Sequence, residues 1–364
     1  MFRCKTLVII LASMMFAAGH AVAQQRELRV FNWSDYIDPK VLEKFSKETG
    51  IRVIYDTYDS NERLETRVLA GNTGYDIVVP SGTFLQRQIR AGVYQKIDRS
   101  RLKNAGNIWK EIDQRMAAYD PGNEYAINYM WFTTGLAYNV QKIRARIGDT
   151  PIDSWDFLFD EDKLSKLASC GVYVLDSPED LFAIALKRLG LDPDNVSREN
   201  LDKAAALLSR IRKHVKKFHS SEYINALANG DICLAVAWAG DAFQAGNRAR
   251  EAGKDYEIAY TIPKEGTLMS MDSIAILKDA KNISEAYEFI DFLLRPEVAA
   301  QNTVITNFAN AVAASKQLIP AAIVNNPAIY PDEQMMKRLF SVQARDNATQ
   351  RLIARSWIRV KTGR

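Results

Sequence analysis

The pattern that most restricts the fold of this chain lies in residues 27–55. Glu27–Phe31 alternates in polarity as a short strand does, and Asp38 and Pro39 then supply a helix cap and the proline favoured at the first helical position. The apolar residues that follow repeat on one helical face, Gly50 ends the helix, and Ile51–Tyr55 is a second strand. This order predicts a β-α-β unit in a fold of the α/β class.

Further apolar segments repeat the unit along the chain. Tyr75–Val79 is apolar apart from Asp76 and stops at Pro80-Ser81-Gly82, which suits a parallel strand buried on both faces. We expect other buried strands at Tyr173–Leu175, Ile232–Ala237 and Ser273–Leu277, and helices at Asn200–Lys216 and Ile283–Leu294. In open sheets of this kind ligands bind beyond the carboxyl ends of the strands.

The first 23 residues have the composition of a secretory signal peptide. Arg3 and Lys5 give a positive start, Leu7–Ala18 is nearly all apolar, and Ala21-Val22-Ala23 is a cleavage pattern. A membrane anchor is the alternative, but the apolar run is shorter than the roughly 20 residues that span a bilayer. We expect export with cleavage near Ala23.

Only two cysteines, Cys170 and Cys233, follow the predicted cleavage point. An even number in an exported chain favours one disulfide, with two buried thiols as the alternative. The bridge would stabilise the fold by roughly 3 to 4 kcal/mol if chain entropy alone acts.

Size and charge limit the class of protein further. The roughly 340 residues that remain after cleavage exceed the size at which one core keeps growing, so two domains are expected. The formal charge of +4 falls to about +2 without Arg3 and Lys5, which argues against a nucleic-acid partner. The one basic cluster, Arg210–Lys217, follows helical spacing and suits a solvated helix face.

Catalytic signatures are weak in this sequence. The mature part has two histidines, His214 and His219, and lacks the nucleophile elbow, the zinc-protease motif, the Walker lysine and the dinucleotide glycine pattern. We therefore expect no catalytic residue, no metal site and no cofactor. A hydrolase of amine conjugates that uses Ser81 or His219 stays as the alternative from a different class.

Aromatic and acidic residues gather at the ends of the predicted strands. Four segments share this character: Trp33-Ser34-Asp35-Tyr36, Ser81-Gly82-Thr83-Phe84, Trp238-Ala239-Gly240-Asp241 and Met271-Asp272-Ser273. Each of them singly could be a core edge or a helix cap. If the loops converge, they form an aromatic box with acidic ends, whose natural ligand is an organic cation.

Longer segments resemble a known family. The segments are VFNWSDYIDPKVLEKFSKETG, GYDIVVPSGTF, YMWFTTGLAYN, SCGVYVLDSPED, FHSSEYINALANGDICLAVAWAGDAFQA and TIPKEGTLMSMD. They resemble the periplasmic polyamine-binding proteins of bacterial ABC transporters, most closely the putrescine-binding type. The similarity extends over nearly the whole mature chain, through IYPDEQMMKRLF and RSWIRVKTG.

The resemblance implies two α/β lobes of the type II periplasmic binding fold, which close on a ligand by hinge bending. Lobe 1 would hold residues 24–131 and 251–304, and lobe 2 residues 132–250 and 305–364, with crossings near 129–134, 247–254 and 303–308. It also supports the bridge between Cys170 and Cys233.

The resemblance further implies a set of ligand-binding residues. Trp33, Tyr36 and Trp238 would be aromatic walls, and the carboxylates of Asp241 and Asp272 would hold the ammonium groups. Polar contacts are expected from Ser34, Asp35, Ser81 and Thr83.

Three positions depart from the putrescine-binding type. Ser270 stands where an aromatic residue is expected, Phe308 replaces a tyrosine, and Asp180 replaces a glutamate. A roomier pocket would follow, for which spermidine, cadaverine or agmatine compete with putrescine.

The expected function is that of a monomeric periplasmic subunit that delivers a di- or polyamine to a membrane permease and its ATPase. A binder of another cationic or zwitterionic solute on the same fold is the alternative.

Overall fold

The computed structural model describes residues 25–363, so the predicted signal peptide and its cleavage point lie outside the described residues. Ten strands form one connected set. They are β1 (Glu27–Trp33), β2 (Arg52–Tyr58), β3 (Ile77–Val78), β4 (Ala126–Asn139), β5 (Val172–Val174), β6 (Lys217–Phe218), β7 (Leu234–Trp238), β8 (Ile258–Thr261), β9 (Met269–Ile276) and β10 (Ala309–Asn310). Their order is β2-β1-β3-β9-β4-β7-β5-β6, with β8 and β10 also paired to β4.

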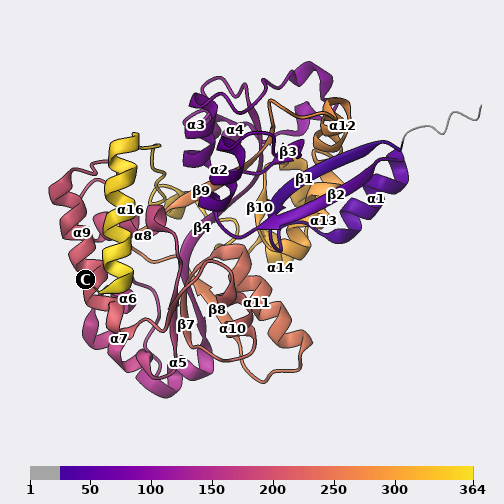
Figure 1. The fold of residues 1–364 in the computed structure, drawn as a ribbon. Coiled ribbons are helices and arrows are strands. Elements are labelled where there is room, and N and C mark those ends of the chain that lie inside the picture. Colours follow the sequence, from indigo (N-terminus) through magenta and orange to yellow (C-terminus); the bar gives the residue numbers. More distant parts are fainter. Residues whose placement is uncertain (1–24, 364) are drawn as a thin grey trace, which may run out of the picture.

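Helices flank both halves of this set (Figure 1). They are α1 (Pro39–Thr49), α2 (Asn61–Leu69), α3 (Gly82–Arg90), α4 (Lys110–Met116), α5 (Val140–Ile147), α6 (Asp156–Phe159), α7 (Glu161–Ala168), α8 (Pro178–Arg188), α9 (Arg198–Ile211), α10 (Glu222–Ala228), α11 (Ala239–Glu251), α12 (Ile283–Leu293), α13 (Pro296–Thr306), α14 (Ala321–Val324), α15 (Glu333–Met336) and α16 (Asn347–Thr362). Among residues 25–363, no helix is long and apolar enough to cross a membrane.

The first β-α-β unit forms as the sequence predicts. The Asp38 carboxylate accepts a hydrogen bond from the backbone N–H of Lys40 and caps α1. Gly50 ends the helix with φ +72°, a left-handed conformation that glycine adopts without a steric penalty. Strands β1 and β2 then pair in parallel, and the buried ring of Phe45 on α1 contacts Phe289 on α12 with a centroid distance of 5.0 Å.

Strand β4 joins the two lobes. Its first half, up to Thr133, pairs with β9, whereas its second half, from Thr134, pairs with β7 (Figure 1). Strand β3 pairs in parallel with β1 but antiparallel with β9, so β9 enters the sheet against the direction of its neighbour. The two-lobed α/β architecture expected from the sequence is confirmed.

We propose other places for two of the predicted crossings. Residues 247–254 lie on α11 and the turn after it, and β8 still pairs with the second half of β4. Strand β10 pairs with Met130 and Trp131 in the first half of β4. We therefore propose that the second crossing lies between Thr261 and Leu268 and that the third follows β10.

One expected helix is shorter than predicted. The segment Asn200–Lys216 was expected to be helical throughout, but α9 ends at Ile211. A short 3₁₀ turn follows, and Lys217 and Phe218 then pair with β5 as strand β6. Pairing with the sheet edge therefore replaces the last helical turn.

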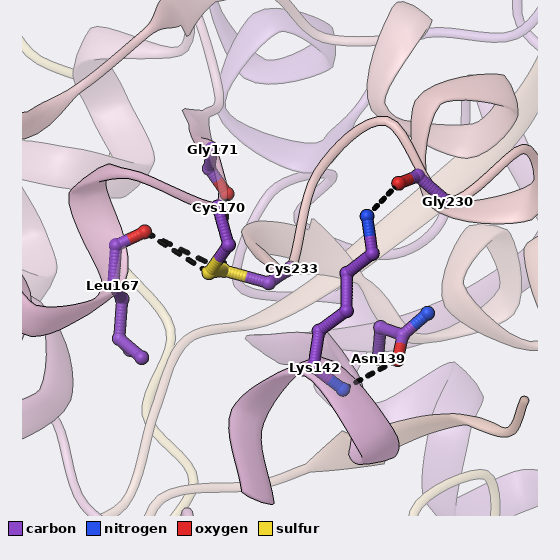
Figure 2. Close-up of a disulfide and its surroundings, with 7 residues drawn as sticks. All are labelled: Asn139, Lys142, Leu167, Cys170, Gly171, Gly230 and Cys233. Atoms are coloured by element: carbon purple, nitrogen blue, oxygen red, sulfur yellow. Dashed lines mark hydrogen bonds between the residues drawn. A yellow bond between two sulfur atoms is a disulfide. The ribbon is translucent and has the colours of Figure 1, made fainter. Parts of the chain in front are cut away.

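A disulfide joins Cys170 to Cys233 in lobe 2, as predicted (Figure 2). The two Cα atoms are 5.5 Å apart, within the usual range for a bridge. Both cysteines are buried beside the carbonyl of Leu167, at the end of β7 that lies away from Trp238.

Candidate functional site

The loop after β1 is held in place by bonds to neighbouring strands. The indole Nε1 of Trp33 donates to the Val79 carbonyl at 2.9 Å, and the backbone N–H of Ser34 donates to the Tyr58 carbonyl at 3.0 Å. Asp35 has φ +56°, so the chain turns sharply between Ser34 and Tyr36. As a result Trp33 and Tyr36 point into the molecule, and Asp35 points away.

Aromatic rings from both lobes meet around one space. Trp33 and Trp238 lie edge to face with centroids 5.7 Å apart, and Tyr36 contacts Phe308 in the same way at 4.7 Å. Phe132 on β4 stands between Phe308, at 5.1 Å, and Trp238, at 6.0 Å. The faces of these rings form apolar walls that suit a methylene chain or a cation.

Asp272 lies at one side of this space on β9. Its Oδ1 accepts a 2.6 Å hydrogen bond from Ser81 Oγ, which in turn accepts one from Asn61 Nδ2 at 2.9 Å. Burial raises the pKa of the Asp272 carboxyl to about 7, although the bond from Ser81 lowers it. Contact with the buried phenol of Tyr36 also lowers the pKa of Asp272.

Asp241 lies at the other side, in the first turn of α11. The phenol of the buried Tyr223 donates to its Oδ2. Burial raises the pKa of the Asp241 carboxyl to about 7, against the lowering effect of Tyr223. Within residues 25–363 neither Asp241 nor Asp272 forms an ion pair, and a cation placed between these two carboxylates would restore their ordinary charge state.

A cavity with about 430 Å³ of space not filled by atoms, part of it open to solvent, lies between these groups. Its walls are Trp33, Ser34, Tyr36, Asp59, Ser81, Phe132, Ser220, Ser221, Ile224, Trp238, Asp241, Asp272 and Phe308. Eight of these residues belong to the predicted set. None of the lining residues is lysine, arginine or histidine, so the cavity suits a cation and offers no partner for a carboxylate.

Five lining residues were not predicted: Asp59, Phe132, Ser220, Ser221 and Ile224. Phe132 lies within a buried run of β4, where nothing in the sequence separates a cavity wall from a core residue. Ser220 and Ser221 precede a short helix, and their position in the quoted FHSSEY segment was the available signal.

Four predicted residues lie outside this cavity. The carboxylate of Asp35 pairs with Arg248 Nη2 at 2.7 Å, because the turn at Asp35 directs it to the surface. Thr83 Oγ1 instead donates to Glu179 of α8. A direct bond from Asp35 to a ligand in the cavity would require this ion pair to break.

Asp180 and Ser270 line a second cavity behind Trp238, as does Thr83. This adjoining cavity shares Ser81, Phe132 and Trp238 with the first one. Asp180 Oδ2 accepts hydrogen bonds from Trp238 Nε1 at 2.9 Å and Thr134 Oγ1 at 3.0 Å. Burial raises its pKa to about 6.

Contacts across the cavity tie the lobes together. Arg87 Nη1 on α3 pairs with Glu179 Oε1 on α8 at 2.8 Å, and both side chains are nearly buried. The pair between Arg248 and Asp35 forms a second link, on the side of α11. The site is therefore assembled only where the two lobes touch.

Comparison with known proteins identifies the family. Residues 40–331 match the family described as bacterial extracellular solute-binding protein.

The chain belongs to this family of extracellular solute-binding proteins.

Relatives at high sequence identity show which type of solute-binding protein this chain resembles. The solute-binding protein is 47% identical over 361 residues to the putrescine-binding periplasmic protein SpuD of Pseudomonas aeruginosa, which covers 99% of this chain and 98% of that one. It is 45% identical over 355 residues to the putrescine-binding periplasmic protein PotF of Escherichia coli, with 97% and 96% covered. The predicted resemblance to the putrescine-binding type is confirmed.

A solved structure agrees in fold. The spermidine/putrescine ABC transporter substrate-binding protein PotD of Streptococcus pneumoniae superposes with a TM-score of 0.76 at 28% identity, covering 93% of this chain and 99% of that one. These relatives are binding proteins, the general class that the sequence predicts for this chain.

Proposed function

We propose that this protein captures a di- or polyamine in the cavity between its lobes and delivers it to the permease and ATPase of an ABC importer. Putrescine is the first candidate, because SpuD and PotF are putrescine-binding proteins. The protein acts as a binder and not as an enzyme. It works in the periplasm as a monomer, after cleavage near Ala23.

The observation that carries the proposal is the pair of buried carboxylates, Asp241 and Asp272, on opposite sides of an aromatic cavity that no lysine, arginine or histidine lines. A dication between them meets both charges, and each charge left unpaired would cost several kcal/mol of desolvation. An amino acid would bring a carboxylate that the lining cannot pair.

The hydrolase alternative finds no support in the geometry. Ser81 Oγ donates to a carboxylate and accepts from the Asn61 amide, so no imidazole activates it. His219 binds the backbone of α10 through Nδ1.

The two cavities favour a second ligand class. Because Ser270 leaves space behind Trp238, and Asp180 lies there without a cationic partner, a longer amine such as spermidine could extend past the indole. We propose Trp33, Ser34, Tyr36, Ser81, Trp238, Asp241, Asp272 and Phe308 as contacts for either ligand, with Thr83, Asp180 and Ser270 added for the longer one.

Isothermal titration of unfolded and refolded protein tests the proposal, because refolding removes any copurified ligand. Putrescine, cadaverine, agmatine, spermidine and spermine are titrated separately at pH 8. We expect one-to-one binding of at least one amine. Absence of binding heat across the whole series would overturn the proposal. Release of amine from acetylated conjugates would support the hydrolase alternative.

A further inference from the structure

His219 holds the first turn of helix α10 through one nitrogen of its ring. Nδ1 accepts hydrogen bonds from the backbone N–H groups of Ser221 and Glu222, both at 3.1 Å. The side chain of Ser221, the residue that precedes the helix, caps no backbone group. The imidazole thus supplies, from two residues before Ser221, the kind of side-chain acceptor that serine, threonine, aspartate or asparagine usually supplies at a helix start.

The segment that His219 fixes carries much of one cavity wall. Ser220, Ser221 and Ile224 line the cavity. Tyr223, in the first turn of α10, donates to the Asp241 carboxylate. A shift of this turn would therefore move three wall residues and the partner of a proposed ammonium ligand together.

Helix α10 also reaches the link between the lobes. Asn225 Oδ1 accepts a 2.8 Å hydrogen bond from Arg248 Nη1, and the other end of that guanidinium pairs with Asp35 in the loop after β1. The direction of α10 is therefore coupled to the contact that brings the lobes together.

We propose that His219 is a positioning residue for amine binding: its unprotonated Nδ1 sets the first turn of α10, and through it the cavity wall and Asp241. The inference rests on the proposed function. His219 does not line the cavity that the amine would fill; it lines a neighbouring cavity, which shares Asp59 and Ser220 with the first one.

Both ring nitrogens of His219 have partners, so the ring is held in one orientation. Nδ1 accepts the two backbone bonds, and Nε2 lies 3.2 Å from Glu222 Oε1. Removal of the Nδ1 acceptor would leave the two backbone N–H groups without this partner and loosen the turn.

Three substitutions distinguish a positioning role of His219 from the effects of its size and charge. His219→Ala removes the acceptor. His219→Asn places the amide oxygen at the distance of Nδ1 from the backbone, where it can accept the same two hydrogen bonds. His219→Gln carries its amide farther out, at the distance of Nε2. His214→Asn, on the short 3₁₀ turn before β6, is the matched control.

The experiment measures the dissociation constant of putrescine at pH 8 by titration calorimetry. We expect His219→Ala and His219→Gln to bind about three- to thirtyfold more weakly than wild type, the range that loss of a helix cap gives. His219→Asn should bind within about threefold of wild type, and His214→Asn should bind as tightly as wild type.

Two results would overturn the inference. If His219→Ala lowers the melting temperature of the ligand-free protein but binds putrescine like wild type, His219 only stabilises the fold. If His219→Asn binds putrescine as weakly as His219→Ala, an acceptor at the place of Nδ1 does not position the cavity wall. Should wild type bind no amine of the series, the proposed function itself fails, which is a distinct outcome.

Discussion

The indole of Trp238 donates its Nε1 hydrogen to Asp180 at 2.9 Å while its ring faces Trp33 across the cavity. One side chain thus separates two cavities, and a buried carboxylate fixes its orientation. Trp238→Phe keeps an aromatic wall but removes the bond, so Asp180 retains only Thr134 as a donor at this oxygen.

We expect Trp238→Phe to weaken putrescine binding about tenfold, because the freed ring no longer holds one orientation and a lost hydrogen bond to a charged group costs about 1.5 to 3 kcal/mol. Calorimetry measures the change. The double substitution Trp238→Phe with Asp180→Asn should lose no more than the single one, and additive losses would contradict the coupling.

Removing either central carboxylate should abolish tight binding. Asp241→Asn or Asp272→Asn leaves one ammonium group buried without its partner, which costs at least about 2 kcal/mol, or roughly a thirtyfold rise in Kd. Asp202→Asn, on an exposed part of α9, is the control and should bind like wild type. Unchanged affinity in both cavity variants would refute the assignment of these carboxylates.

Binding of the amine should release protons near neutral pH. Burial raises the pKa values of Asp241 and Asp272 to about 7 in the ligand-free protein, so each is about half protonated at pH 7, and a dication favours the charged form. We expect release of roughly one proton per amine at pH 7 and much less at pH 8.5. Titrations in buffers of different ionisation enthalpy measure it, and proton uptake would contradict the prediction.

The same raised pKa values affect the ligand-free fold. Carboxyl groups whose folded pKa exceeds the unfolded value stabilise the folded state at low pH, and this contribution is lost as the pH rises from about 4 to about 7. Denaturant titrations should show a smaller decline over this window for the Asp241→Asn, Asp272→Asn double variant than for wild type.

Gly240 is required for the position of Phe308. A Cβ atom at Gly240 would lie 2.3 Å from Cδ2 and 2.4 Å from Cε2 of that ring. Since the ring packs between Tyr36 and Phe132, Gly240→Ala should displace it, cost about 1 to 3 kcal/mol of stability and weaken amine binding. Gly246→Ala on the same helix meets only ordinary contacts, at 3.5 Å or more, and should leave binding unchanged.

The disulfide should affect stability and spare binding. Its sequence separation of 63 residues corresponds to about 4 kcal/mol of chain entropy. Strand β7 separates Cys233 from Trp238 by about 17 Å at the usual rise per residue. The Cys170→Ala, Cys233→Ala variant should therefore unfold at lower denaturant concentration with an unchanged Kd for putrescine, and a large change in Kd would show coupling along β7.

Much of the prediction from sequence depended on rules that involve only neighbouring residues. The bounds of α1 followed from Asp38, Pro39 and Gly50, since capping depends on neighbouring residues alone. Most of the predicted aromatic and acidic residues also line one cavity, because strand ends of one sheet converge.

What the sequence could not supply depends on contacts between distant segments. The direction of β9 is set by pairing with β3 and β4, and nothing within its own residues marks it as antiparallel. The carboxylate of Asp35 is a group that commonly contacts an ammonium ligand. The left-handed backbone conformation of Asp35 nevertheless directs this carboxylate toward Arg248. Phe132 was missed because a buried strand residue has the same sequence signal whether it faces core or cavity.

The position of β9 in the sheet also bears on how the chain matures. Strand β3 obtains its second neighbour only from residues 269–276, which follow most of lobe 2 in the chain. Until that segment emerges during synthesis or secretion, β1, β2 and β3 form a partial sheet with an unpaired edge, which must be kept from pairing with other chains. The first lobe can therefore complete its sheet only after β9 has emerged.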